Sequence, residues 1–284
     1  MRFKINLRKE NDAANNVPIN NQHLLFSYIH TCLGRNNEWH GKPGDYCISG
    51  LCGGQMNPDM KTLSYLNGGY VIVASDDEKF LEAIINGLIK NKDLVAGMRF
   101  SDFELIEEKI YDGYNHFYTL SPILLKVNSL EDKRSCKTVI LKARGYEKFE
   151  RYHNLVIMDY PEYEETLTKY LIRKLTTINE KKDLGLDLDG FRVTVRKHDL
   201  NMIKNIHADK PNGSSVGNPS TICNLTIYSN KKVAELISNI GIGMSTAFGF
   251  GTIYKVENSK TYHFLKMKRN ENTSESMKYE EHPV

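Results

Sequence analysis

Residues 223–254 have the sequence CNLTIYSNKKVAELISNIGIGMSTAFGFGTIY. Their first part alternates apolar and polar residues, which predicts a strand. Four apolar residues then follow at i, i+3, i+4 and i+7, the spacing of one helix face: Val233, Leu236, Ile237 and Ile240. The glycine-rich stretch GIGMSTAFGFG, residues 241–251, separates this helix from a last predicted strand, GTIYKVE. The segment therefore predicts a strand, a helix and a second strand, with a loop of unusual composition before the last strand.

The first half of the chain predicts a strand, a helix, two strands, a helix and a strand. In chain order these are RFKINL, a helix from Gln22 to Leu33 capped by Asn21, YCISGL, YVIVAS, a helix capped by Asp76 or Asp77, and FELIEEKIY. FYTLSPILLKV follows as a further strand that leads into the second half. This β-α-β-β-α-β order is typical of a ferredoxin-like unit, in which helices cover one face of an antiparallel sheet.

The second half repeats this order. Its predicted elements are the strand HNLVIMDY, a helix from Tyr163 to Ile178, the strands FRVTVRKH and ICNLTIYS, the helix after Lys231, and GTIYKVE. We therefore expect an α+β protein made of two tandem ferredoxin-like domains, residues 1–126 and 127–257, the second of which carries the glycine-rich loop. Residues 258–284 are polar, and we expect them to form a disordered tail.

The composition fits an ordinary globular chain. It has 284 residues, of which 26% are charged and 40% hydrophobic, and a formal net charge of +3 that neither requires nor excludes nucleic acid. The second half holds two basic clusters: Lys133, Arg134, Lys137, Lys142, Arg144, Lys148 and Arg151 form one, and Arg192, Arg196 and Lys197 the other. Each cluster fits either a solvated face or a surface that contacts phosphates.

Several other classes are disfavoured. The opening MRFKINLRKE lacks the apolar stretch of a secretory signal. The stretch from Leu236 to Tyr254 has no charged residue, but its four glycines and its hydroxyl and amide side chains argue against a membrane span. Five cysteines contain no CxxC pair, which favours free thiols. We therefore expect a cytoplasmic protein.

The glycine-rich loop matches no standard nucleotide motif. A dinucleotide fingerprint needs glycine where Thr246 stands, and a phosphate-binding GK[ST] motif occurs nowhere in the chain. Two interpretations stay open. The glycines either form a helix C-cap at Gly241 and a tight turn into an edge strand, or leave backbone amides uncovered to bind phosphate.

Residues 223–254 resemble the C-terminal signature of the CRISPR-associated endoribonucleases that cut precursor CRISPR RNA within each repeat, the sixth Cas family of the RAMP superfamily. VPINNQHLLFSYIHTCL near the N-terminus, FYTLSPI and PEYEETLTKYLIRKL also match, so that the resemblance covers about residues 1–256. The family has two RRM-like (ferredoxin-like) units, in agreement with the repeated element order.

The resemblance implies metal-independent RNA cleavage without a cofactor. In this family the 2′-hydroxyl upstream of the cut attacks the phosphate, which leaves a 2′,3′-cyclic phosphate and a 5′-hydroxyl. Many members place a catalytic histidine just after the first helix, in a W-x-H or W-L-H context followed by glycine. Asn37-Glu38-Trp39-His40-Gly41 stands at this place, so the resemblance assigns the role to His40. Histidine suits proton transfer because its ordinary pKa is near 6.5.

Helper residues are assigned by position. Tyr28 matches a tyrosine that assists in some members, although its spacing equally fits packing on the apolar face of the helix. Lys42 is the available charge-stabilising lysine, but it lies closer to the histidine than usual and also fits an exposed loop lysine. His30 or His23 would take the catalytic role if the alignment slips. Trp39 suits either base stacking or a packing anchor.

We expect RNA contacts from the glycine-rich loop and from the strand FRVTVRKH: Gly241, Gly243, Ser245, Thr246, Gly249, Gly251, Arg192, Arg196 and Lys197. No metal is expected, because His198 and Asp199 form only a bare pair. The implied partner is CRISPR repeat RNA, and no membrane is involved. A CRISPR effector complex as further partner, and the choice between monomer and homodimer, stay open. The alternative function is a non-catalytic repeat-RNA-binding subunit of such a complex.

Overall fold

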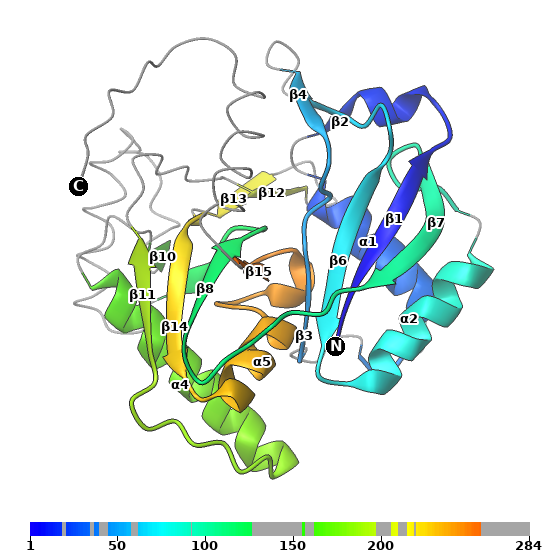
Figure 1. Cartoon of the computed structure of the whole chain (residues 1–284). Coiled ribbons are helices and arrows are strands. Elements are labelled where there is room, and N and C mark those ends of the chain that lie inside the picture. Colours follow the sequence, from blue (N-terminus) through cyan, green and yellow to red (C-terminus); the bar gives the residue numbers. More distant parts are fainter. Residues whose placement is uncertain are drawn as a thin grey trace.

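A computed structural model describes residues 1–18, 21–34, 37–39, 45–57, 62–91, 93–126, 155–156, 162–196, 206–209, 215–218 and 220–256. The fold is α+β and contains two four-stranded antiparallel sheets (Figure 1). The predicted tail and the basic cluster at residues 133–151 lie outside the described residues. Within the described ranges, no helix has both the length and the apolar character needed to cross a bilayer.

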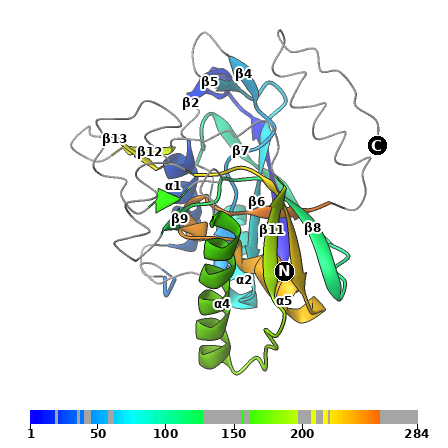
Figure 2. The same cartoon turned by 90° about the vertical axis from the view of Figure 1, so that its left-hand side faces the viewer.

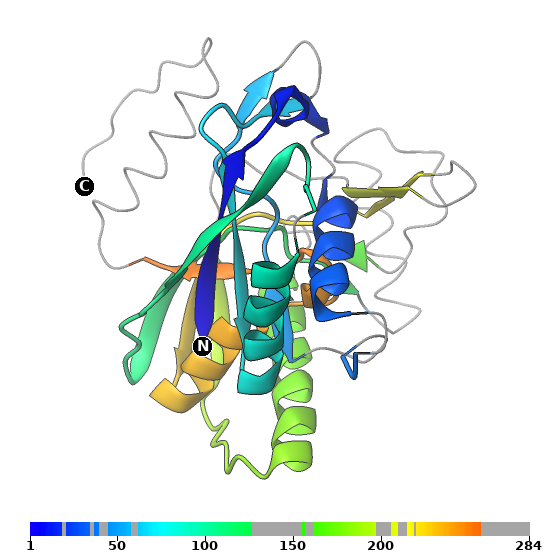
Figure 3. The same cartoon turned by 90° about the vertical axis from the view of Figure 1, so that its right-hand side faces the viewer.

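The first sheet has the strand order β3-β6-β1-β7, the order of a ferredoxin-like unit. Its elements are β1 (Arg2–Lys9), α1 (Gln22–Leu33), β3 (Tyr46–Ile48), β6 (Gly69–Ser75), α2 (Glu78–Lys90) and β7 (Met98–Leu105). Figure 3 shows α1 and α2 side by side on one face of this sheet. The helices approach closely at Gly87, where a Cβ would lie 2.0 Å from the carbonyl oxygen of Cys32.

The second sheet repeats the same arrangement in the order β11-β14-β8-β15. Its elements are β8 (Gly113–Thr119), α4 (Tyr163–Lys182), β11 (Arg192–Arg196), β14 (Asn224–Ser229), α5 (Lys231–Ile240) and β15 (Ile253–Lys255). Residues of α4 and α5 form one apolar core with the inward residues of these strands. The prediction of two tandem ferredoxin-like units with antiparallel sheets is confirmed.

Shorter elements complete the described part of the chain. A three-stranded sheet in the order β2-β5-β4 contains β2 (Val17–Pro18), β5 (Thr62–Ser64) and β4 (Gln55–Asn57). Two separate ladders pair β9 (Leu125–Lys126) with β10 (Leu155–Val156) and β12 (Ile206–Asp209) with β13 (Ser215–Asn218). The short 3-10 helices are η1 (Asp12–Asn15) and η3 (Thr246–Phe248), the second of which lies within the glycine-rich loop.

One strand assignment from the sequence is wrong. HNLVIMDY was expected to open the second sheet, but its β10 pairs with β9 in a separate ladder, and β8 occupies the first-strand position between β14 and β15. The strand expected at FELIEEKIY ends at Leu105. The change from the first sheet to the second therefore falls between Leu105 and Gly113, ahead of the boundary expected after residue 126. Alternating sequence identifies a strand, but partner strands elsewhere decide which sheet it joins.

The predicted helix caps are partly confirmed. The carboxylate of Asp77 accepts hydrogen bonds from the amides of Lys79 and Phe80 at the start of α2. At the start of α1, Asn21 makes no capping bond; its side-chain amide instead donates to the carbonyl oxygen of Pro18 at 3.1 Å. Asn21 therefore bonds to the chain that precedes α1, and the first turn of the helix has no side-chain cap.

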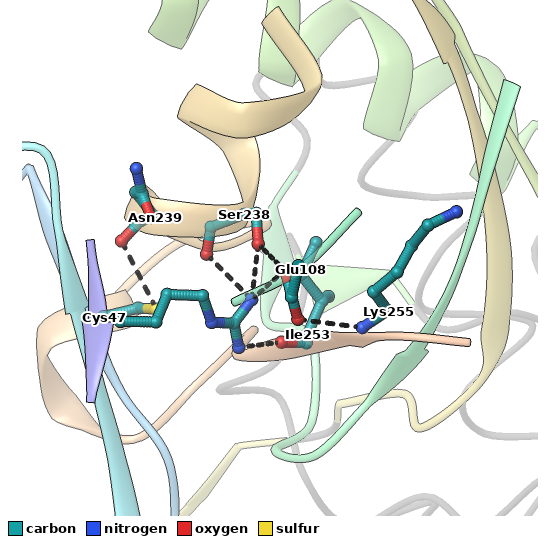
Figure 4. A network of polar contacts seen from close by, with 7 residues as sticks. Cys47, Glu108, Ser238, Asn239, Ile253 and Lys255 are labelled. Carbon is teal, nitrogen blue, oxygen red and sulfur yellow. Dashed lines mark hydrogen bonds and ion pairs between the residues drawn. The ribbon is translucent and has the colours of Figure 1, made fainter. Parts of the chain in front are cut away.

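The two units are joined by a buried polar network (Figure 4). Arg2 of β1 is only 2% exposed, and its guanidinium contacts the Glu108 carboxylate at 3.1 Å. The same guanidinium donates to the hydroxyl of Ser238 in α5 and to the carbonyl oxygen of Ile253 in β15. Nearby, the Cys47 thiol donates to the carbonyl oxygen of Asn239. The first sheet is thus attached directly to the last helix and strand of the second unit.

Candidate functional site

The four loop glycines are buried, and all of them have a positive φ, between +61° and +84°. Such φ values favour glycine because a Cβ strains the backbone there. A Cβ at Gly251 would lie 1.7 Å from the carbonyl oxygen of Ile242, and one at Gly243 would lie 2.6 Å from that of Leu124. Turn geometry and close packing therefore account for the glycines. Their contact with RNA stays a prediction.

Several backbone amides of the loop donate hydrogen bonds inside the protein. The amides of Ile242, Met244 and Gly251 donate to the carbonyl oxygens of Gly251, Leu124 and Pro122, respectively, at 2.8 Å. These bonds hold the loop in a fixed shape after α5.

The loop docks on the first unit through three contacts. The Thr246 hydroxyl is buried and donates to the carbonyl oxygen of Tyr46 at 2.9 Å. A Cβ at Gly249 would lie 2.9 Å from Cγ of Gln22, at the first turn of α1. Phe248 stacks on Phe26 of α1 with 4.2 Å between ring centroids. The glycine-rich loop and α1, which are far apart in sequence, therefore form one continuous surface.

Two loop side chains are exposed on this surface. Ser245 is exposed in a left-handed conformation before η3, and Phe248 is 52% exposed although it stacks on Phe26. Phe26 also contacts the His30 ring at 4.1 Å between centroids. The surface thus combines an exposed hydroxyl, two phenyl rings and a histidine. Thr246, whose hydroxyl is engaged with Tyr46, has a structural role here.

The histidines of α1 differ in exposure. His23 is exposed on the first turn, and His30 is half-buried beside Phe26. His40 and Lys42, the catalytic candidates from the sequence, lie outside the described residues. Their assignment stays a prediction.

Trp39, which precedes His40, is a packing anchor in this structure. Its indole Nε1 donates to the Asp77 carboxylate at 2.9 Å, and its ring packs edge-on against Phe80 with 5.5 Å between centroids. Because Asp77 also caps α2, this bond places Trp39, the residue before His40, at the N-terminal end of that helix. Of the two uses that the sequence allowed for Trp39, packing is the one observed.

Tyr28 lies on the buried side of α1. It is part of the apolar core of the first unit, and burial raises the pKa of its hydroxyl well above the ordinary value. This position matches the packing alternative that the sequence left open. Its assistance in catalysis stays a prediction.

Lys174 of α4 is a site residue that the sequence interpretation missed. Its Nζ donates to the carbonyl oxygens of Ile240 and Gly241, at 3.2 Å and 3.3 Å, where α5 ends and the glycine-rich loop begins. Burial lowers its pKa to about 8, although Cys47 and Asp45 act in the opposite direction. The available signal was a lysine placed at helical spacing within the apolar face of α4, between Leu171 and Ile178.

Arg192 and Arg196 lie exposed on the same face of β11. The Arg192 guanidinium lies over the ring of Tyr228 in β14, 4.2 Å from its centroid. Lys197 lies outside the described residues. The two arginines therefore belong to the outer face of the second sheet rather than to the junction of the loop with α1. Within the described part of the chain, no three His, Cys, Asp or Glu side chains cluster as metal ligands would.

The family model described as "CRISPR associated protein Cas6, C-terminal" matches residues 105–254, more than half of the chain. No curated protein matches the chain in sequence. Three solved structures share its fold. A structure titled "CRISPR associated protein Cas6" is 19% identical with a TM-score of 0.65, and the alignment covers 90% of this chain and 99% of that one.

The second is titled "An RAMP protein binding different RNA substrates" and is 18% identical with a TM-score of 0.69. The alignment covers 90% of this chain and 100% of that one. The third concerns a Cas6-related gene from Pyrococcus furiosus; it is 18% identical with a TM-score of 0.67, over 91% of this chain and 99% of that one. At these identities the structures establish the fold alone, and the family model establishes the family. The chain belongs to the Cas6 family of CRISPR-associated proteins.

Proposed function

We propose that this protein is a metal-independent endoribonuclease that cuts CRISPR precursor RNA within its repeats. The observation that carries the proposal is the stacking of Phe248 on Phe26, 4.2 Å apart, which joins the family's C-terminal loop to α1. The chain that follows α1 leads through the anchored Trp39 to His40. Residues from both units would then act on one RNA.

The proposed reaction needs two proton transfers. The 2′-oxygen upstream of the cut forms a bond to phosphorus and loses its proton to a base. The bond from phosphorus to the 5′-oxygen breaks, and that oxygen takes up a proton. The products are a 2′,3′-cyclic phosphate and a 5′-hydroxyl, and general acid–base groups contribute about two to four decades to such a rate.

His40 is the proposed general acid–base residue, and Lys42 would stabilise charge on the phosphorane. Tyr28 is the weakest of the three assignments, because burial raises its pKa and places its ring in the core. Its hydroxyl would reach the RNA only if α1 shifts when RNA binds. His30 and His23 are the alternatives on α1 itself.

A second function is a non-catalytic repeat-RNA-binding subunit of a CRISPR effector complex. The observation that favours it is the buried position of Tyr28, whose ring packs in the apolar core of the first unit. In that case the surface formed by the loop and α1 would bind RNA without cutting it.

Incubation of the full chain with its repeat RNA in excess EDTA distinguishes the two functions. We expect one discrete cut, with cyclic-phosphate and 5′-hydroxyl ends, that disappears when the 2′-hydroxyl upstream of the cut is replaced by hydrogen. Tight binding without a cut would support the non-catalytic subunit. A product with 3′-hydroxyl and 5′-phosphate ends would contradict the proposed chemistry.

A further inference from the structure

The outer face of the second sheet carries aromatic and basic side chains in register. Arg192 of β11 lies opposite Tyr228 of β14, which in turn lies opposite Tyr114 of β8. Residues directly opposite each other on neighbouring strands share a face. His116, two positions after Tyr114, and Arg196, four positions after Arg192, lie on this face too. We call these five residues the aromatic-basic face.

These side chains are not needed for the core. The alternate residues of the same strands, such as Val193, Leu225 and Phe117, are buried beneath α4 and α5. Tyr114, by contrast, is 62% exposed. Figure 2 shows α4 on one side of the sheet. The strand register places the aromatic-basic face on the other side. Burial therefore does not explain why two tyrosines lie on the outer side.

The face is partly fixed before any ligand binds. The Arg192 guanidinium covers the Tyr228 ring, 4.2 Å from its centroid. The rings of Tyr114 and His116 are 5.4 Å apart, and Nδ1 of His116 lies 2.8 Å from the Thr226 hydroxyl. Such contacts limit the side-chain freedom that a ligand would otherwise have to remove.

Its charge is of one sign. In the described strands β8, β11, β14 and β15, no position that faces this side is Asp or Glu, whereas Arg192 and Arg196 are both exposed. Burial, Lys255 and Arg196 lower the pKa of His116, which favours its uncharged ring at neutral pH. Flat rings between cations suit a ligand with stackable bases and a negative backbone.

We propose that the aromatic-basic face binds a single-stranded part of the RNA, with a base stacked on Tyr114 and phosphates held by Arg192 and Arg196. A four-stranded sheet can bind RNA by stacking two or three bases on exposed aromatic residues. Bases in a duplex are already stacked, so an unpaired segment is required. The assignment of this RNA to the CRISPR repeat rests on the proposed function.

This face would hold the RNA away from the cut. It lies on the opposite side of the second sheet from α5, whose C-terminal end leads into the glycine-rich loop. Loss of the face should therefore weaken RNA binding and leave the rate of cleavage at saturating protein unchanged.

Fluorescence anisotropy with the full chain and a labelled single-stranded repeat tests the proposal. We expect Tyr114→Ala to weaken the affinity about tenfold, the effect of losing one base stack. Tyr114→Phe should bind like the wild type because it keeps the ring. Arg192→Gln should weaken binding and reduce the slope of log affinity against log salt by about 0.7, the value for one phosphate on a single strand.

Two matched controls accompany these variants. Tyr111 is 57% exposed, a fraction similar to that of Tyr114. It lies before β8 and contacts Lys255. In β15 the residue on the aromatic-basic side is Tyr254, so Lys255 alternates to the opposite side. Arg173 is exposed on α4, on the helix side of the sheet. Tyr111→Ala and Arg173→Gln should leave the affinity unchanged.

The outcomes separate this proposal from the proposed function. If the wild type cuts the repeat and Tyr114→Ala and Arg192→Gln bind as tightly as the wild type, the aromatic-basic face is not an RNA site, while the endoribonuclease proposal stands. Equal losses in the controls would also overturn it, as would equal losses with a fully duplex RNA. A wild type that binds no RNA would overturn both proposals.

Discussion

Arg2 in the first strand and Glu108 in the link between the two sheets form a buried ion pair of 3.1 Å, with side chains 2% and 7% exposed. Ser238 of α5 contacts both partners, since its hydroxyl lies 2.5 Å from Arg2 Nη1 and from the Glu108 carboxylate. The Lys255 amide donates to the other carboxylate oxygen at 3.0 Å. A single arginine of the first sheet thus contacts both α5 and β15.

Glu108→Ala should lower the free energy of unfolding by about 3–5 kcal/mol, because it leaves the Arg2 charge buried without its partner. Chemical denaturation measures this loss. The exposed pair between Lys4 and Glu104 offers the control, and Glu104→Ala should change the stability little. A Glu108→Ala protein as stable as the Glu104→Ala protein would mean that the buried pair is not required to join the units.

Gly251→Ala should destabilise the protein more than Gly185→Ala. Both glycines have similar φ, +61° and +58°, so both substitutions impose a similar backbone strain, of the order of 1–2 kcal/mol. A Cβ at Gly251 meets the Ile242 carbonyl oxygen at 1.7 Å, whereas a Cβ at Gly185 meets nothing within 4 Å. The difference between the two unfolding free energies isolates the steric contact. Equal losses would show that the loop moves without cost.

Lys174→Met should remove a contribution that makes the wild type more stable as the pH rises from 8 to about 10. Burial in the folded state lowers the pKa of Lys174 to about 8 from its ordinary value of 10.5, so in this window the unfolded chain binds the extra proton. Wild-type stability should therefore rise with pH relative to the variant, by at most about 1.4 kcal/mol per pH unit.

The measurement is the difference in unfolding free energy between wild type and Lys174→Met at several pH values. This difference cancels the opposing effect of buried thiols and tyrosines, whose raised pKa values reduce stability at high pH. The lost bonds to Ile240 and Gly241 add an offset that does not vary within the window. A difference that stays constant from pH 7 to pH 10 would contradict the lowered pKa of Lys174.

Phe248→Ala should weaken repeat-RNA binding about fivefold or more, because it removes the exposed ring that the loop presents beside α1. The cost in stability should stay near 1 kcal/mol, the value of one aromatic pair. Leu66→Ala is the matched control, since Leu66 is 58% exposed and lies in the first unit. Unchanged affinity with unchanged melting temperature would remove Phe248 from the RNA surface.

The sequence predicted most helices and strands because their apolar periodicity is strong, as in α5, where six of the ten residues are buried. It failed at β8 because strand partners depend on contacts such as Phe117 with Leu225, which no local pattern encodes. The glycine-rich loop was recognisable by composition. Its packing against Gln22 and Tyr46 depends on how the two units meet, which is set by residues as distant as Arg2 and Ser238.

The most direct test of the account is the single-turnover cleavage of the repeat RNA in excess EDTA by wild type and His40→Ala. We expect the variant to bind RNA with wild-type affinity and to cut it about two to four decades more slowly, the contribution of a general acid–base group. Lys90→Ala, at the exposed end of α2, controls for an unrelated substitution. A His40→Ala protein that cuts at the wild-type rate would contradict the assignment of catalysis to this residue, and a wild type that never cuts would contradict the endoribonuclease itself.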